Sequence, residues 1–160
     1  MAGGDNARTM NQAPPTLTPP PWVLCLGYAG LIPFVGCSLW LWRVEPGMLP
    51  WAALALAGYA ATIASFLGGI HWGLAMRGGS DAGWLPYAWG VIPSVLAWAS
   101  VLLPRHAGLV VLGGLLLACY GVDRRLYRHY GLQRWLPLRW RLTLVAMLSC
   151  WLGAWGAFFL

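Results

Sequence analysis

Long apolar stretches separated by short polar segments dominate the chain after residue 21. A helix needs about 20 apolar residues to cross a hydrocarbon core of about 30 Å. A transmembrane β-barrel instead needs segments of about ten residues with alternating polarity, and runs such as LALAGYAATIASFLGGI do not alternate. The pattern therefore predicts an all-α integral membrane protein, a five-transmembrane-helix bundle over residues 22–160. The expected spans are 22–42, 50–76, 84–103, 106–122 and 140–160.

The first 21 residues, MAGGDNARTMNQAPPTLTPPP, follow a different pattern, polar and then proline-rich. Five prolines within residues 14–21 favour an extended tether over a helix. We expect residues 1–21 to be a disordered tail, and they lack the charged and apolar regions of a signal peptide.

Composition supports the membrane assignment, because 59% of the residues are hydrophobic and only 9% are charged. Soluble domains carry about 25% charged residues. The formal charge of +6 comes from arginines that flank the apolar stretches, which favours anionic lipid headgroups over nucleic acid as partners. The four cysteines, which lie inside the spans without paired spacing, are expected to be small buried hydrophobes and not metal ligands. They are Cys25, Cys37, Cys119 and Cys150.

The arginines also predict the orientation. With five spans, eight of the ten arginines fall on one side of the membrane and only Arg43 and Arg105 on the other. The positive-inside rule then places the N-terminus in the cytoplasm and the C-terminus outside. Most of the bias comes from the expected fourth loop, DRRLYRHYGLQRWLPLRWR, which is either a topology determinant or a specific lipid or partner patch. Its candidate headgroup-binding residues are Arg124, Arg125, Arg128, Arg134, Arg139 and Arg141.

The second span carries small residues at every fourth position. Without a hydrophobic force between helices in lipid, small residues allow the close backbone approach on which packing depends. We expect this face to make the second span the central packing helix, with the similarly small-faced fifth span as its best candidate partner. The predicted packing residues are Ala57, Ala61, Ser65, Gly68, Gly69 and Gly73.

His71, in the stretch SFLGGIHWG, lies at the edge of this face and within about two turns of the cytoplasmic boundary. Asp123 ends the fourth span, where the helix dipole disfavours an acid, so it needs a partner; His71 and Arg124 are the candidates. His71 either makes an interhelical hydrogen bond, worth about 0.6 kcal/mol on average, or serves a small ligand such as a quinone, a lipid or a proton-coupled solute. The candidate polar and aromatic set is His71, Trp72, Tyr28, Tyr87, Trp89, Tyr120 and Asp123.

Two similar stretches, GYAGLIP (27–33) and PYAWGVIP (86–93), each end in a proline. We expect Pro33 and Pro93 to kink their helices. Their similarity raises an alternative architecture of two repeated helical hairpins followed by a fifth helix.

Residues suited to catalysis are scarce. The chain has no nucleophile–base pair, no HExxH, no phosphate-binding loop and only four acidic residues. Haem ligation needs two inward histidines, whereas His106 and His129 fall in loops. We therefore expect no enzyme activity and no cofactor. The predicted function is that of a non-enzymatic accessory or assembly factor acting through membrane partners, with ligand binding around His71 as the alternative.

Several separate stretches carry a family resemblance: LGYAGLIPFVG (26–36), FLGGIHWGLA (66–75), WGVIPSVLAW (89–98), DRRLYR (123–128) and LRWRLTL (138–144). Together they resemble the domain of unknown function 3429 family, uncharacterised inner-membrane proteins related to mitochondrial transmembrane protein 69. The resemblance covers about residues 22–160. It implies a small multi-pass protein of a bacterial or mitochondrial inner membrane with no assigned activity, and it supplies no catalytic residues. We expect this chain to lie in the bacterial cytoplasmic membrane.

Overall fold

The computed structural model describes residues 19–78 and 83–159, and this part of the chain contains helices and turns but no strand. Most of the predicted tail, residues 1–18, lies outside the described residues. The helices are α1 (Pro21–Ala29), α2 (Ile32–Leu41), α3 (Leu49–Gly78), α4 (Leu85–Val101), α5 (Arg105–His129) and α6 (Leu136–Phe159), with short 3-10 turns η1 (Pro46–Met48) and η3 (Gln133–Trp135).

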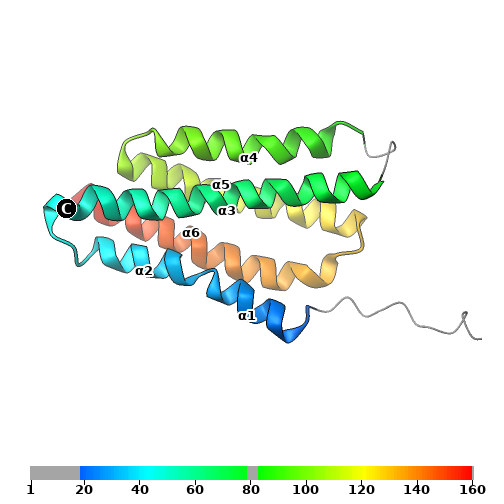
Figure 1. The fold of residues 1–160 in the computed structure, drawn as a ribbon, viewed down its shortest axis with the longest axis horizontal. Coiled ribbons are helices and arrows are strands. Elements are labelled where there is room, and N and C mark those ends of the chain that lie inside the picture. Colours follow the sequence, from blue (N-terminus) through cyan, green and yellow to red (C-terminus); the bar gives the residue numbers. More distant parts are fainter. Residues whose placement is uncertain (1–18, 79–82, 160) are drawn as a thin grey trace, which may run out of the picture.

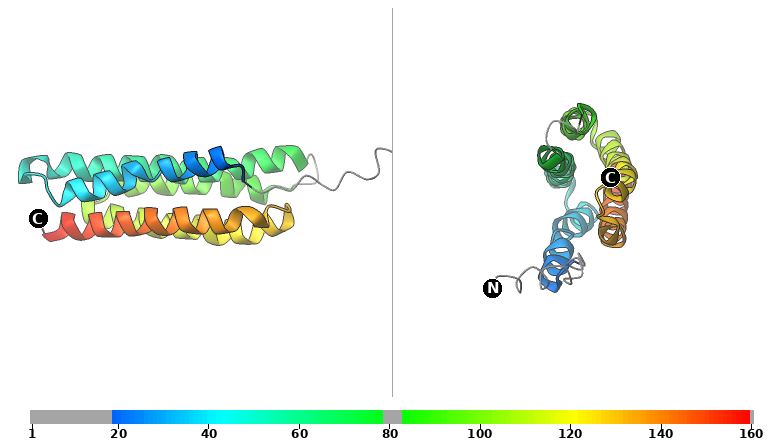
Figure 2. Two further views of the ribbon diagram at one scale, coloured as in Figure 1. Left: turned by 90° about the horizontal axis from the view of Figure 1, so that it is seen from below. Right: turned by 90° about the vertical axis from the view of Figure 1, so that its right-hand side faces the viewer.

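The helices run antiparallel along one long axis (Figure 1). Viewed down that axis, α1, α2 and α3 form one layer, α5 and α6 form the second, and α4 closes one edge (Figure 2). Leucines from three helices, α2, α3 and α5, are fully buried between the layers: Leu41, Leu56, Leu109, Leu112 and Leu116. The start of α1 and the end of α6 lie at opposite ends of the bundle (Figure 1).

The all-α membrane class of the prediction is confirmed. Four helical segments are long and apolar enough to cross a membrane, namely Pro21–Leu41, Pro46–Arg77, Arg105–Arg128 and Gln133–Phe159. The third apolar segment is shorter, because α4 has only 17 residues.

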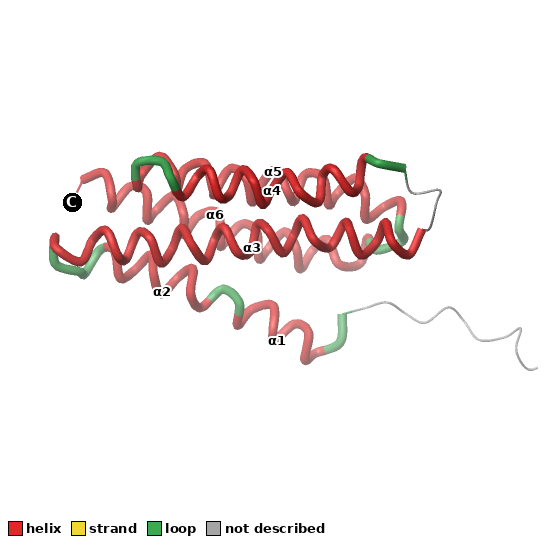
Figure 3. Tube along the Cα trace, turned by 45° about the horizontal axis from the view of Figure 1, so that its top comes forward, coloured by secondary structure: helices red, strands yellow, loops and turns green. Residues whose placement is uncertain are grey.

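The first span is interrupted near Pro33, as the sequence predicts, and becomes two helices joined through Gly30 and Leu31 (Figure 3). Proline lacks the N–H that would continue the helical ladder. At the break the Tyr59 hydroxyl of α3 donates a hydrogen bond of 2.8 Å to the carbonyl oxygen of Gly30. By contrast α4 runs on through Pro93, so the two similar stretches differ in local structure.

The expected fourth loop is wrong in extent, because α5 continues to His129 and α6 already begins at Leu136. Arginine and leucine are good helix formers, so the arginine-rich stretch extends the helix. The turn occurs at Gly131, which adopts a φ of +71°, a left-handed conformation that glycine adopts readily. The Leu132 N–H then donates to the Tyr127 carbonyl oxygen at 2.8 Å, the bond that closes a Schellman motif.

Of the predicted packing residues of α3, Ala57 and Gly68 are buried within the described structure, whereas Gly69 and Gly73 are exposed. A Cβ added at either of those two glycines would meet no atom within 4 Å. Ala61 and Ser65 are half-buried at the edge of the packed face. The face that packs runs instead through Ala53, Ala57, Ala60, Ala64 and Gly68.

The expected partner of α3 is also wrong. Its main neighbour is α4, while α6 packs mainly on α5 and touches α3 less. At the α3–α4 crossing, a Cβ on Gly68 would overlap the backbone oxygen of Gly90. The small face of α6 is nevertheless buried, with Ala146, Cys150 and Gly153 among its residues.

Candidate functional site

Three side chains from three helices form a polar cluster inside the bundle, which we call the triad: His71 of α3, Asp123 of α5 and Arg139 of α6. The His71 Nε2 donates to Asp123 Oδ1 at 3.0 Å. Arg139 donates from Nε to Asp123 Oδ2 at 2.9 Å and makes a second hydrogen bond to the same oxygen from Nη2. The contact that the sequence predicts between His71 and Asp123 is therefore present.

The local folding of the helices explains why these side chains meet. Because α5 extends beyond the expected span, Asp123 lies within the helix and projects inward. Arg139 follows the Gly131 turn in the antiparallel α6, so it returns to the same depth as Asp123. His71 lies one turn beyond Leu67 and Gly68 on the buried side of α3.

Burial is nearly complete for two members of the triad: His71 and Asp123 are each 1% exposed, and Arg139 is 13% exposed. A charge in such surroundings is costly unless it is paired, and here the aspartate is matched by a guanidinium. The hydrogen bond to Asp123 requires a proton on His71 Nε2. The other ring nitrogen, Nδ1, is buried and has no hydrogen-bond partner in the described structure. The arrangement ties three helices together and leaves the carboxylate oxygens occupied.

The aromatic candidates do not gather around His71. The Trp72 Nε1 donates to the Tyr87 carbonyl oxygen at 2.8 Å, and the two rings meet edge to face at 5.5 Å, so they connect α3 to α4. Tyr120 packs on Trp140 with ring centroids 5.1 Å apart. Tyr28 accepts a hydrogen bond of 3.4 Å from Arg141, which links α1 to α6. The buried Nε1 of Trp89 has no hydrogen-bond partner among the described residues.

Arg139 is the member of the triad whose contact with Asp123 the sequence analysis does not predict. It was expected with the headgroup arginines, yet its guanidinium is turned toward Asp123, and Arg124, the expected alternative partner, is exposed. A signal was available in the sequence. Two residues that are equally far along the chain from a tight turn between antiparallel helices lie at similar depth. Asp123 and Arg139 are such a pair around Gly131.

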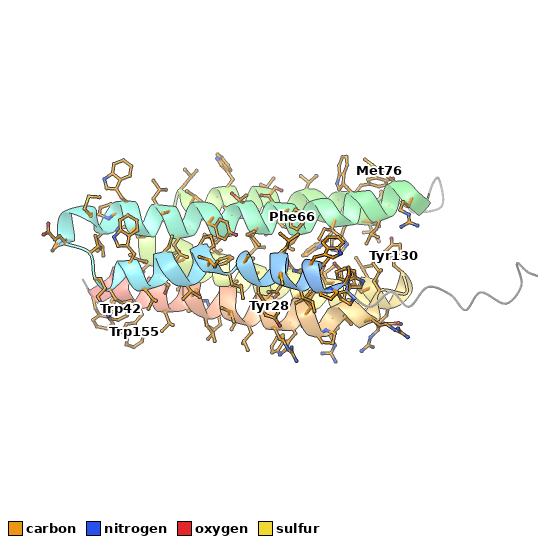
Figure 4. The ribbon with its side chains drawn as sticks, turned by 60° about the horizontal axis from the view of Figure 1, so that its bottom comes forward. Tyr28, Trp42, Phe66, Met76, Tyr130 and Trp155 are labelled. Carbon is orange, nitrogen blue, oxygen red and sulfur yellow. The ribbon has the colours of Figure 1, made fainter. Side chains whose placement is uncertain are left out.

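The remaining headgroup candidates, Arg124, Arg125, Arg128, Arg134 and Arg141, are exposed. They lie at the end of the bundle where α3 and α5 end and α6 begins, called here the arginine-rich end (Figure 1). Met76 and Tyr130 mark this end in Figure 4.

Cavities lie beside α1, between α3 and α5, and between α5 and α6, and neither His71 nor Trp72 lines any of these. Within residues 19–78 and 83–159, no group of three His, Cys, Asp or Glu side chains could hold a metal ion. His71 and Asp123 are buried inside the bundle, whereas Arg139 also lines the two cavities beside α1.

These features define a multi-pass helical membrane protein. Its helices are long and apolar enough to cross a bilayer, large apolar side chains are exposed on its surface, and its buried acid is paired. The chain belongs to the DUF3429 family, described as a protein of unknown function, whose profile matches residues 19–155. This membership confirms the resemblance seen in the sequence.

Two relatives, both called transmembrane protein 69, are similar over most of the chain. The protein from Xenopus tropicalis is 39% identical over 132 residues, which is 79% of this chain and 51% of the relative. The protein from Mus musculus is 32% identical over 139 residues, or 83% of this chain and 55% of the relative. The chain thus spans about half the length of these relatives. No solved structure matches it.

Proposed function

We propose that this protein is a non-enzymatic accessory or assembly factor of the bacterial cytoplasmic membrane that acts by packing against a transmembrane helix of another protein. The observation that carries the proposal is a lipid-facing stripe of small residues on α3, called here the outer stripe. It consists of Gly58, Thr62, Ser65, Gly69 and Gly73, which are exposed or half-buried.

The outer stripe is shaped for a helix and not for acyl chains. A Cβ added at Gly58, Gly69 or Gly73 would meet no atom within 4 Å, so a second backbone can approach closely there. The Thr62 hydroxyl donates to the Gly58 carbonyl oxygen at 3.0 Å, and the Ser65 hydroxyl to the Ala61 carbonyl oxygen at 2.9 Å. Both hydroxyls are thus satisfied within α3, and the stripe presents a flat surface without unpaired donors.

The triad supports a partner-based role more than a chemical one. Its carboxylate is engaged on both oxygens, and no described cavity reaches His71. A ligand or proton site around His71, the alternative from the sequence, would rest on the single unpaired Nδ1 atom.

The proposal includes five crossings, with the N-terminus in the cytoplasm and the C-terminus outside. Seventeen residues give α4 a length of about 26 Å, which approaches the thickness of a hydrocarbon core. The antiparallel course of α4 between α3 and α5 (Figure 1) supports a third crossing. The exposed arginines at the arginine-rich end support a cytoplasmic location for that end.

Site-specific photo-crosslinking in membranes tests the partner. We expect a benzophenone side chain at Thr62 to form an adduct with one other membrane protein, and a benzophenone at Val95 on the exposed side of α4 to form none. Gly69→Leu together with Gly73→Leu should abolish the Thr62 adduct and complementation of a deletion strain while the protein still accumulates. A Thr62 adduct of twice the mass of the chain would make the partner a second copy. Equal adducts at Thr62 and Val95 would contradict the proposal.

A further inference from the structure

We propose that a groove between α1, α3 and α6 binds one anionic phospholipid, independently of the partner on the outer stripe. The groove, called here the α1 groove, consists of two adjoining cavities of about 200 and 580 Å³. Both are lined by Leu26, Gly27, Phe66, Arg139 and Leu142. Figure 4 shows this side of the molecule, with Tyr28 and Phe66 labelled.

The groove is open because α1 lies loosely on the bundle. None of its residues is buried. On the N-terminal side of the break at Gly30, α1 diverges from the other helices (Figures 1 and 3). At Gly27 the helix lies against α6, because an added Cβ there would be 3.3 Å from Leu142 Cδ1. Because the bilayer surrounds the helices, lipid is the molecule that reaches such a groove first.

Both cavities are lined mainly by apolar side chains and both include Arg139, a combination that matches an amphiphile. The smaller cavity extends toward the middle of the bundle and is lined by Leu31, Phe34, Ile63 and Leu116. The larger cavity extends toward the arginine-rich end and adds Tyr127, Leu132 and Trp135 to Arg139. An acyl chain fits the apolar lining that the two cavities share, and a headgroup fits the side of the groove that faces the exposed arginines.

The charge at the polar end favours an anionic headgroup. Arg128, Arg134 and Arg141 are exposed there, whereas Asp123, the acidic residue described at this end, is buried and paired. The Arg139 guanidinium carries five N–H donors, of which Asp123 accepts two. A phosphate at the mouth of the groove would therefore meet the positive charge of the exposed arginines and N–H donors of Arg139.

Lipids with a diazirine on the acyl chain test this inference on the full-length protein in phosphatidylcholine nanodiscs. We expect diazirine phosphatidylglycerol to label peptides of α1, α3 and α6 at the groove more than diazirine phosphatidylcholine does, by about fivefold for each arginine engaged at the membrane surface. Arg134→Gln with Arg141→Gln should lower the phosphatidylglycerol labelling toward the phosphatidylcholine level. Equal labelling by the two lipids would overturn the inference.

Variants that fill the groove with a larger side chain provide a second test of the inference. Leu142→Trp, in the groove, should reduce the labelling, whereas Leu148→Trp, on the exposed side of the same helix, should not. Leu26→Trp on the loosely packed α1 repeats the test without changing α6. Unchanged labelling in a folded Leu142→Trp or Leu26→Trp protein would also overturn the inference. Gly69→Leu with Gly73→Leu should leave the labelling intact, which separates this result from the proposed partner.

Discussion

Asp123 accepts hydrogen bonds from α3 and α6 while it belongs to α5, so one carboxylate connects three helices. The helix dipole disfavours an acid near a helix C-terminus, and the arginine opposite compensates for this cost. His71 completes the cluster, but the charge balance depends on Asp123 and Arg139. The two bonds to Asp123 should therefore differ in their contribution to stability.

Asp123→Asn should destabilise the protein by about 3 kcal/mol, the lower end of the range for breaking a buried ion pair. The substitution keeps the shape of the side chain but leaves the Arg139 charge without its counter-ion. His71→Gln is the matched control, because glutamine can still donate to Asp123, and it should cost about 1 kcal/mol or less. Unfolding in mixed micelles with increasing denaturing detergent measures both. Equal unfolding midpoints for the two variants would show that the ion pair does not dominate.

At the scale of the helices, glycine acts in two opposite ways on α3. Gly68 allows α3 to approach the Gly90 backbone of α4, and Gly69, the next residue along, faces away from every other described helix. Rotation by one residue on a helix changes the direction of the side chain by about 100°, so neighbouring glycines can serve different surfaces. Internal packing and the proposed partner surface thus lie side by side on one helix.

Gly68→Leu should disrupt the fold, since its side chain would collide with the α4 backbone and force the two helices apart. Gly69→Leu should leave the thermal stability of the detergent-solubilised protein nearly unchanged. Melting temperatures of the two purified variants decide the matter, with Ile70→Leu as the volume-conserving control. A large loss of stability for Gly69→Leu with none for Gly68→Leu would reverse the assignment of faces.

At the scale of the whole molecule, the antiparallel course places the start of α1 and the end of α6 at opposite ends (Figure 1). Whether the ends lie on opposite sides of the membrane depends on α4, which is shorter than the four candidate spans. The exposed arginines at one end then decide the direction of insertion.

Reporter fusions test this topology in bacterial cells. Alkaline phosphatase fused after Leu160 should be active, because the enzyme needs an oxidising compartment outside the cytoplasm. The same reporter inserted at Gly131, in the turn between α5 and α6, should be inactive. An inactive C-terminal fusion together with an active one at Gly131 would contradict the proposed topology, because α6 would then cross in the opposite direction.

Local properties of the chain were predictable from the sequence because they depend on neighbours along the chain. Apolar length predicted the membrane class, and Pro33 predicted the break between α1 and α2. Depth along the helices was enough to match His71 with Asp123, since an ionisable group in the bilayer needs a partner at its own level.

Tertiary structure alone decided which face of each helix turns inward and which helices become neighbours. A helix that is apolar on all sides lacks the contrast between apolar and polar faces that marks the buried side of a soluble helix. The fit between whole helix surfaces therefore decided two outcomes. Gly68 and not Gly69 became the packing residue, and α4 and not α6 became the main neighbour of α3. The inward turn of Arg139 and the opening of the α1 groove followed from that same fit.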